Sequence, residues 1–165
     1  MLVNLHPTDA QKEAGNYKKA HIRFQGLPVT IENPKGTMRR GPGWQVRVPY
    51  DYGYIKRTEG ADGDHVDVCI GPDPESDHVF VVDQHDHRTG KFDEHKVMLG
   101  YHTKEQAERA YCAGFSDGKG PKRMKKVTTM SMPEFKNFLK RKGGHIDRAL
   151  AVTSVYRKQH DRDAG

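Results

Sequence analysis

Three carboxylates stand close together in residues 61–72, whose sequence is ADGDHVDVCIGP. Asp62 and Asp64 flank Gly63, and Asp67 follows three residues later, inside an apolar run. Carboxylates crowded in this way repel one another, and a cation is needed to neutralise them. Mg²⁺ binds through one or two carboxylates while it keeps several waters. The spacing therefore predicts a site for a hard divalent cation.

The apolar residues that follow predict a strand over 66–70, on which Asp67 points away from Val66 and Val68 because successive side chains alternate between faces. An acidic turn without a metal is the alternative, since Asp and Gly are common turn residues. An EF-hand is excluded, because Asp67 occupies the sixth loop position, where that loop requires Gly. The nearby histidines have no cysteine partners at zinc-ligand spacing; they are His85, His87 and His95.

The net charge of +6 is unevenly distributed along the chain. Residues 51–95 contain twelve acidic and four basic side chains and carry −8, so the rest of the chain carries +14. An acidic centre within a basic frame suits a site that holds cations together with an anionic ligand, whereas a nucleic-acid backbone needs only the basic part. The basic stretches also lack interleaved aromatic residues. We do not expect a nucleic-acid partner.

Length and composition indicate one domain, since 165 residues are enough for a single core but not for two. No apolar run approaches the roughly 20 residues that a membrane span requires, so no membrane partner is expected. The two cysteines, Cys69 and Cys112, are too few for a disulfide framework. We expect a cytoplasmic protein with reduced thiols.

The elements that must position the acids are short strands followed by helices. β-Branched and apolar segments predict strands at 21–24, 29–31, 45–48, 52–55, 66–70, 79–82 and 97–99. Capping-box sequences at 103–106 and 131–134 predict two later helices. Residues 32–44 and 116–127 are rich in Gly, Pro and basic side chains and are predicted to be loops.

Strands first and helices afterwards indicate an α+β protein. We expect a small OB-like five-stranded β-barrel with C-terminal helices packed on it. The chain divides into an N-terminal arm at 1–20, a main domain at 21–142 and a polar C-terminal tail at 143–165.

Residues 48–72, VPYDYGYIKRTEGADGDHVDVCIGP, resemble the signature region of family I soluble inorganic pyrophosphatases. In that family a YGYI-type strand precedes an Asp-Gly-Asp-Pro-Val-Asp-Val motif. The chain resembles still more closely the pyrophosphatase-like domain of phage and mobile-element polyvalent proteins, over about residues 14–140. This second resemblance is carried by AGNYKKAHIRFQGLPVTIENPKG, DGDHVDVCIGP, VFVVDQ, TGKFDEHKVMLG and MSMPEFKNFL.

The resemblance implies roles for the acids. Asp64 corresponds to the residue that orients or deprotonates the attacking water. Asp93 matches a later family acid by residue type and Glu94 by its acid-x-Lys spacing, so both stay open. The metal ligands implied are Asp62, Asp67, Asp86, Asp93, Glu94 and Glu32.

The resemblance also implies phosphate contacts from Lys, Arg and Tyr side chains. Tyr52 matches the family through YGYI, whereas the loop that carries the arginines differs in length, so they are matched only by type. Tyr111 precedes Cys112 where the family has Lys, and His65 stands where the family has Pro or Glu. The phosphate-binding candidates are Tyr52, Lys96, Arg39, Arg40, Arg47 and Tyr111.

Together these features imply a hydrolase of phosphoanhydrides that depends on Mg²⁺, or alternatively on Mn²⁺, and that acts on inorganic pyrophosphate. One alternative is a nucleotide phosphoanhydride hydrolase on the same fold. Another is a non-catalytic phage module that binds metal and phosphate. The expected partner is a small anionic substrate, a homo-oligomer stays open, and a phage-encoded chain would act in the host cytoplasm.

Overall fold

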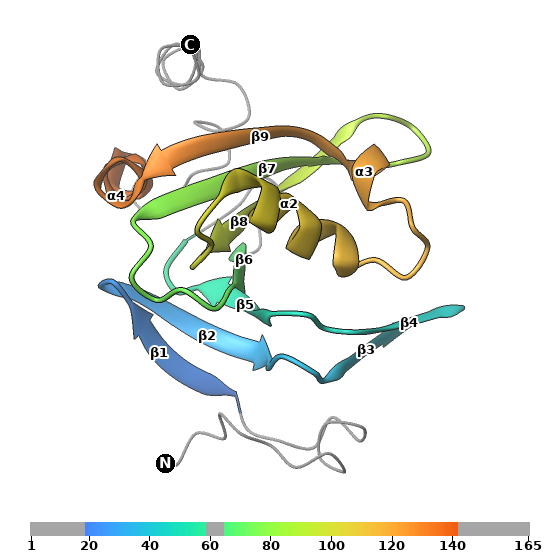
Figure 1. Ribbon diagram of the computed structural model, residues 1–165, viewed down its shortest axis with the longest axis horizontal. Coiled ribbons are helices and arrows are strands. Elements are labelled where there is room, and N and C mark those ends of the chain that lie inside the picture. Colours follow the sequence, from blue (N-terminus) through green and yellow to red (C-terminus); the bar gives the residue numbers. More distant parts are fainter. Residues whose placement is uncertain (1–18, 59–64, 142–165) are drawn as a thin grey trace.

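The fold is built on a seven-stranded sheet, seen in a computed structural model that describes residues 19–58 and 65–141 (Figure 1). The strand order is β1-β2-β5-β6-β8-β7-β9. Neighbours are antiparallel except β6 and β8, which are parallel. The strands are β1 (Ala20–Phe24), β2 (Leu27–Asn33), β5 (Asp51–Ile55), β6 (Val66–Ile70), β7 (His78–His85), β8 (Phe92–Leu99) and β9 (Met124–Ser131).

A separate hairpin of β3 (Met38–Gly41) and β4 (Trp44–Arg47) connects β2 to β5 and extends away from the main sheet (Figure 1). Its base is held by two backbone hydrogen bonds of 2.8 Å, from Gly36 N–H to the Val48 carbonyl and from Val48 N–H to the Thr37 carbonyl. Strand β3 lies in a segment predicted to be a loop, and that part of the prediction is wrong.

The sheet has a hydrophobic core on each face, because alternate strand residues point to opposite sides. On β8, Val97 and Leu99 belong to the core that includes Phe135 of helix α4 (Met132–Arg141). Met98 belongs to the other core, together with Tyr111 of helix α2 (Lys104–Ala113). The cluster of charged residues described below lies on the α2 side.

Both predicted helix starts are confirmed. The Thr103 hydroxyl accepts the Gln106 N–H at 3.1 Å, and the Gln106 side chain accepts the His102 N–H at 2.7 Å. At α4, the Ser131 hydroxyl accepts the Glu134 N–H at 3.2 Å, while the Glu134 carboxylate accepts the Ser131 N–H at 2.9 Å. At α4 the two bonds are reciprocal, as in a capping box, whereas at α2 the Gln106 side chain bonds the residue before the Thr103 cap. Both arrangements satisfy N–H groups near a helix start.

The α+β class is confirmed, but the small five-stranded barrel is not. The sheet has seven strands, and within the described residues its outer strands β1 and β9 do not pair with each other. The short helix α3 (Gly120–Arg123) and the first half of strand β9 occupy residues 116–127, which were predicted to be a basic loop. Most of the predicted N-terminal arm and all of the predicted C-terminal tail lie outside the described residues.

Gly53 allows β5 to lie close against β2. It pairs with Ile31 on β2 and with Val68 on β6. A methyl group on Gly53 would stand 1.8 Å from the backbone carbonyl oxygen of Thr30. A backbone atom in a paired strand cannot move aside without loss of its ladder hydrogen bonds, so the position admits no side chain.

We predict that Gly53→Ala lowers the free energy of unfolding by about 3 kcal/mol, near the upper end for overpacking. The measurement is urea denaturation followed by circular dichroism. Gly43→Ala is the control, because nothing lies within 4 Å of the added methyl group. Its φ of +75° limits the cost to about 1 kcal/mol. Equal losses in the two variants would contradict the tight spacing of β2 and β5.

Candidate active site

Asp67 and Lys96 lie side by side because their strands run parallel. The β6–β8 register pairs Asp67 directly with Lys96. The Lys96 ammonium lies 2.6 Å from Oδ2 of Asp67. Tyr52, on β5 at the other side of β6, donates its hydroxyl to the same Oδ2 at 2.8 Å. The Lys96 Nζ also lies 2.5 Å from the Tyr52 hydroxyl oxygen, so the three polar groups contact one another in pairs.

Glu94 completes this group, which we call the charged cluster: Tyr52, Asp67, Glu94 and Lys96. Glu94 stands two residues before Lys96 on β8 and therefore on the same face of the sheet. Its Oε1 lies 3.2 Å from the Lys96 Nζ. The side chains of Lys96, Glu94 and Asp67 are 12%, 20% and 27% exposed, so these charged groups are largely shielded from solvent.

Burial and mutual contact shift the pKa values of the cluster. Burial alone lowers the pKa of Lys96, but the oxygens of Tyr52, Asp67 and Glu94 outweigh it and hold that pKa well above its usual value. Burial likewise opposes the charged form of Asp67, yet Lys96 and Tyr52 keep its pKa below normal. Burial, with the charge of Asp67, raises the pKa of Glu94 to about 7, even though Lys96 acts to lower it. Of the two carboxyls in the cluster, Glu94 is therefore the one with the higher pKa.

A cavity of about 630 Å³ lies against the charged cluster. It is bounded by the β3–β4 hairpin, the segment after α2, and the connection between β7 and β8, which all lie toward the right in Figure 1. Two acidic side chains, Glu94 and Asp117, line it. Its basic side chains outnumber them and are Arg39, Arg88, Lys96, Lys119 and Arg123.

Comparison with known proteins shows the family of the chain. The model of the family described as Inorganic Pyrophosphatase matches residues 9–140. The chain belongs to the inorganic pyrophosphatase family. No curated protein and no solved structure matches it significantly. The resemblance to pyrophosphatases is thus confirmed, while the closer relationship to phage polyvalent proteins stays a prediction.

Of the six metal ligands that the family resemblance implies, the structure brings Asp67 and Glu94 together. Asp62 and Asp64 lie outside the described residues. Asp67 and Glu94 meet in the charged cluster, where both contact the Lys96 ammonium, at 2.6 and 3.2 Å. Two carboxyl groups this close suit Mg²⁺, which takes one or two carboxylates and retains water. No larger metal-ligating group of His, Cys, Asp or Glu occurs among residues 19–58 and 65–141.

The remaining predicted ligands contact other groups. Glu32 pairs with Lys19 at 3.3 Å. Asp86 accepts the backbone N–H groups of Arg88 and Thr89 at 2.8 and 3.0 Å, which closes the turn between β7 and β8. These two hydrogen bonds lower the pKa of its exposed carboxyl. Such an Asp is a turn-forming residue by its geometry.

Asp93 accepts a hydrogen bond from the Gln84 side chain at 2.9 Å. Gln84 pairs with Glu94, and His85 pairs with Phe92, so Asp93 is the extra residue of a β-bulge. Of the two acids that the sequence left open, Glu94 is the one in contact with Lys96.

Four of the six predicted phosphate contacts line the cavity, namely Arg39, Tyr52, Lys96 and Tyr111. The guanidinium of Arg39 lies 4.5 Å from the centre of the Tyr52 ring. The other two arginines contact the β3–β4 hairpin and its base: Arg40 donates to the Gln45 side chain at 3.2 Å, and Arg47 donates to the Gly36 carbonyl at 2.7 Å. Neither of these arginines lines the cavity.

Several residues that line the cavity were not predicted from the sequence. Arg123 forms two hydrogen bonds with Asp117, of 2.9 and 2.8 Å, and stacks over Phe115 at 4.3 Å. Gln84 accepts the Tyr111 hydroxyl at 2.6 Å. The basic composition of 116–127 was the only signal for Arg123 and Lys119, and composition does not show which side chains face a cavity.

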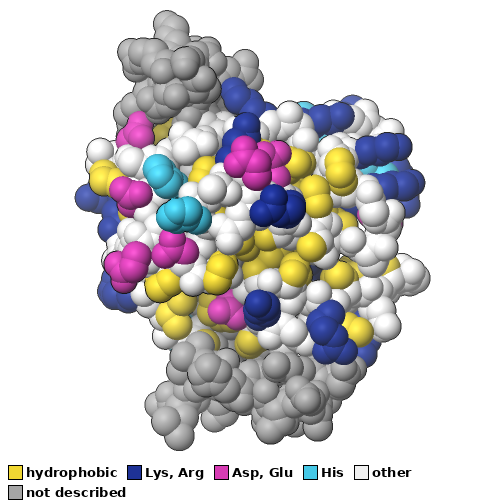
Figure 2. All heavy atoms as spheres, in the orientation of Figure 1, with side chains coloured by type: hydrophobic (Ala, Val, Ile, Leu, Met, Phe, Trp, Pro, Cys, Tyr) yellow, Lys and Arg dark blue, Asp and Glu magenta, His cyan; other side chains and the backbone are white. Residues whose placement is uncertain are grey.

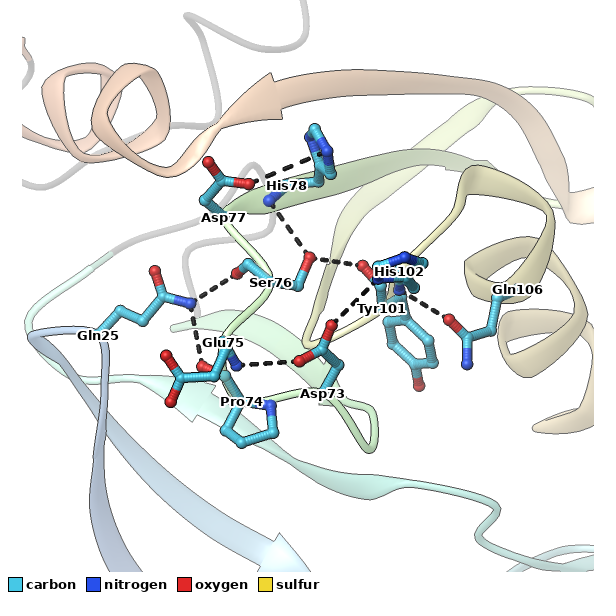
Figure 3. A network of polar contacts seen from close by, with 10 residues as sticks. All are labelled: Gln25, Asp73, Pro74, Glu75, Ser76, Asp77, His78, Tyr101, His102 and Gln106. Carbon is cyan, nitrogen blue, oxygen red and sulfur yellow. Dashed lines mark hydrogen bonds and ion pairs between the residues drawn. The ribbon is translucent and has the colours of Figure 1, made fainter.

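The acidic loop at residues 73–77 forms hydrogen bonds that connect parts of the fold. In the loop before β7, Asp73 accepts the Glu75 N–H at 3.1 Å and lies 3.3 Å from the His102 ring (Figure 3). Ser76 donates its hydroxyl to the Tyr101 carbonyl at 2.7 Å, and Gln25 donates to the Ser76 carbonyl at 2.6 Å. Part of the acid-rich segment thus joins the β1–β2 turn to the start of α2 and does not line the cavity.

No helix among the described residues is long and apolar enough to cross a membrane.

We predict that Lys96→Met lowers the free energy of unfolding by about 3 kcal/mol in metal-free buffer at neutral pH. The change leaves the largely buried carboxyls of Asp67 and Glu94 without their cation, and 3 kcal/mol is the lower end for breaking a buried ion pair. Chemical denaturation measures the loss. Lys125→Met, on an exposed position of β9, is the control and should stay within about 0.5 kcal/mol of the wild type. An unchanged Lys96→Met would show that the cluster does not depend on the ammonium.

Proposed function

We propose that the chain is a Mg²⁺-dependent hydrolase that converts inorganic pyrophosphate into two phosphates with water as the nucleophile. The observation that carries the proposal is the contact of Asp67 and Glu94 with Lys96 at the wall of a predominantly basic cavity, in a chain of the inorganic pyrophosphatase family. The carboxylates suit the cation and the basic wall suits the anionic substrate.

We assign the metal to Asp67 and Glu94, together with Asp62 of the signature. When bound, Mg²⁺ would neutralise phosphate charge and lower the pKa of its water. The assignment of Glu32, Asp86 and Asp93 as further ligands receives no support from their contacts, which are with Lys19, with a turn and with Gln84.

The protein's own groups would bind and orient the substrate. Lys96 donates toward phosphate oxygens, and its longest contact, to Glu94 at 3.2 Å, is the one that a phosphate oxygen displaces most readily. Asp67 and Tyr52 also contact the ammonium and hold it in position. Arg39, stacked on Tyr52, adds a second positive charge at the same wall. Asp64 is proposed to accept the proton of the attacking water.

We predict that the wild type releases phosphate from pyrophosphate with Mg²⁺ and that Asp64→Asn lowers the rate at least about a hundredfold, the usual range for loss of a general base. A colorimetric phosphate assay at saturating substrate measures the rate, with Mn²⁺ as a second metal. The control is Asp77→Asn, because the Asp77 side chain is 74% exposed and does not line the cavity. Metal binding without turnover in the wild type would instead indicate a non-catalytic module.

We further predict that Mg²⁺ raises the melting temperature of the wild type and has a much smaller effect on Asp67→Asn. A ligand at a hundred times its dissociation constant stabilises the folded state by about 2.7 kcal/mol. Differential scanning calorimetry across a Mg²⁺ titration measures the shift without any need for activity. An equal shift in Asp67→Asn would remove Asp67 from the metal site.

A further inference from the structure

The cavity is larger than inorganic pyrophosphate requires. Its volume of about 630 Å³ falls in the range of about 300–1,000 Å³ that is typical of sites for drug-sized ligands. Pyrophosphate is only two phosphoryl groups joined by one oxygen, and the charged cluster would contact it along one part of the wall. The rest of the wall is partly aromatic and includes Trp44, Tyr50 and Phe115.

Trp44 is the exposed part of this aromatic wall. It is the only tryptophan of the chain, and its 42% exposure makes it the one large hydrophobic side chain exposed among the residues that the structure describes. A methyl group on Gly41, its partner across the hairpin, would stand 2.3 Å from the indole nitrogen. The indole is therefore held against the Gly41 backbone, while part of it lines the cavity.

Arg39 connects this indole to the charged cluster. Its guanidinium carbon lies 6.0 Å from the centre of the Trp44 ring and 4.5 Å from the centre of the Tyr52 ring. The Tyr52 hydroxyl in turn contacts Lys96. One wall of the cavity thus carries the positive charges of Lys96 and Arg39, which suit phosphates, next to the flat ring of Trp44, which suits a base. The face drawn in Figure 2 shows hydrophobic side chains near its centre, with Lys and Arg as well as Asp, Glu and His side chains around them.

We propose that the cavity binds a nucleoside polyphosphate, with its phosphate chain at Lys96 and Arg39 and its base stacked on Trp44. This inference rests on the proposed hydrolase function and names the substrate class of the same site. In the reaction, the water oxygen forms the new bond to phosphorus and the bridging P–O bond breaks. The bridging oxygen leaves with the nucleoside phosphate, and the proton of the water passes to the general base of the proposed function and from it to solvent.

The single tryptophan provides a direct test. The probes are the imidodiphosphate analogue of ATP, and imidodiphosphate itself as the counterpart of pyrophosphate, both with Mg²⁺. We expect the nucleotide analogue to quench the Trp44 emission saturably, because a stacked base contacts the indole. Imidodiphosphate should displace the nucleotide analogue and restore the emission.

Calorimetry then compares affinities in variants. Trp44→Ala should lower the ratio of nucleotide to imidodiphosphate affinity about tenfold, the scale of one base–aromatic stack. Trp44→Phe should restore most of that ratio because it keeps a stacking surface. Gln45→Ala, on the same hairpin but outside the cavity wall, should leave it unchanged.

The outcomes separate this inference from the proposed function. An affinity ratio that is the same in wild type and Trp44→Ala, with pyrophosphate still hydrolysed, overturns the nucleotide proposal alone. Nucleotide binding through Trp44 without phosphate release from either pyrophosphate or ATP supports the binding site and overturns the hydrolase. Absence of binding by both probes overturns both proposals.

Discussion

The parallel register of β6 and β8 determines the charge arrangement of the cavity. It pairs Asp67 with Lys96 and, through the two-residue repeat of β8, brings Glu94 to the same face. Parallel neighbours need a long connection, and here that connection contains the whole of β7, which returns to pair with β8 on its far side. The hydrogen-bonded loop before β7 and the β-bulge at Asp93 therefore belong to the connection that places Lys96 beside Asp67.

The charged cluster is an arrangement that stability alone does not favour. Removing charges from water costs several kcal/mol per ion, and well-packed apolar side chains in place of a buried ion pair are often neutral or stabilising. The α2-side core already contains Cys69 and Met98, the neighbours of Asp67 and Lys96 two positions farther along their strands. An apolar continuation of these rows would have extended that core. Charged groups at this position instead suit the binding of a charged ligand.

Local rules predicted much of the fold. Both helix starts, the strands at 21–24 and 29–31, and strand β6 were visible in short stretches of sequence. Strand β9 was not, because its polar first half resembles a basic loop until it pairs with β7. The contact of Tyr52 with Asp67 and Lys96 was not predicted, because it depends on the pairing of three strands. The family resemblance implied only that Tyr52 and Lys96 bind phosphate and that Asp67 binds a metal. Asp86 was predicted to be a metal ligand because it is an acidic residue, but its carboxylate bonds the backbone of a local turn.

The junction of β9 and α4 contains no linker. Ser131 ends the strand and caps the helix, and the next residue, Met132, donates its N–H to the Asp77 carbonyl at 2.6 Å. Each helical residue advances the helix by about a hundred degrees of rotation. One inserted residue would therefore turn Phe135 and Phe138 away from the sheet and toward water. The length of this joint sets the rotational phase of the last helix, and a family member that lengthened it would have to repack an entire layer of its interior.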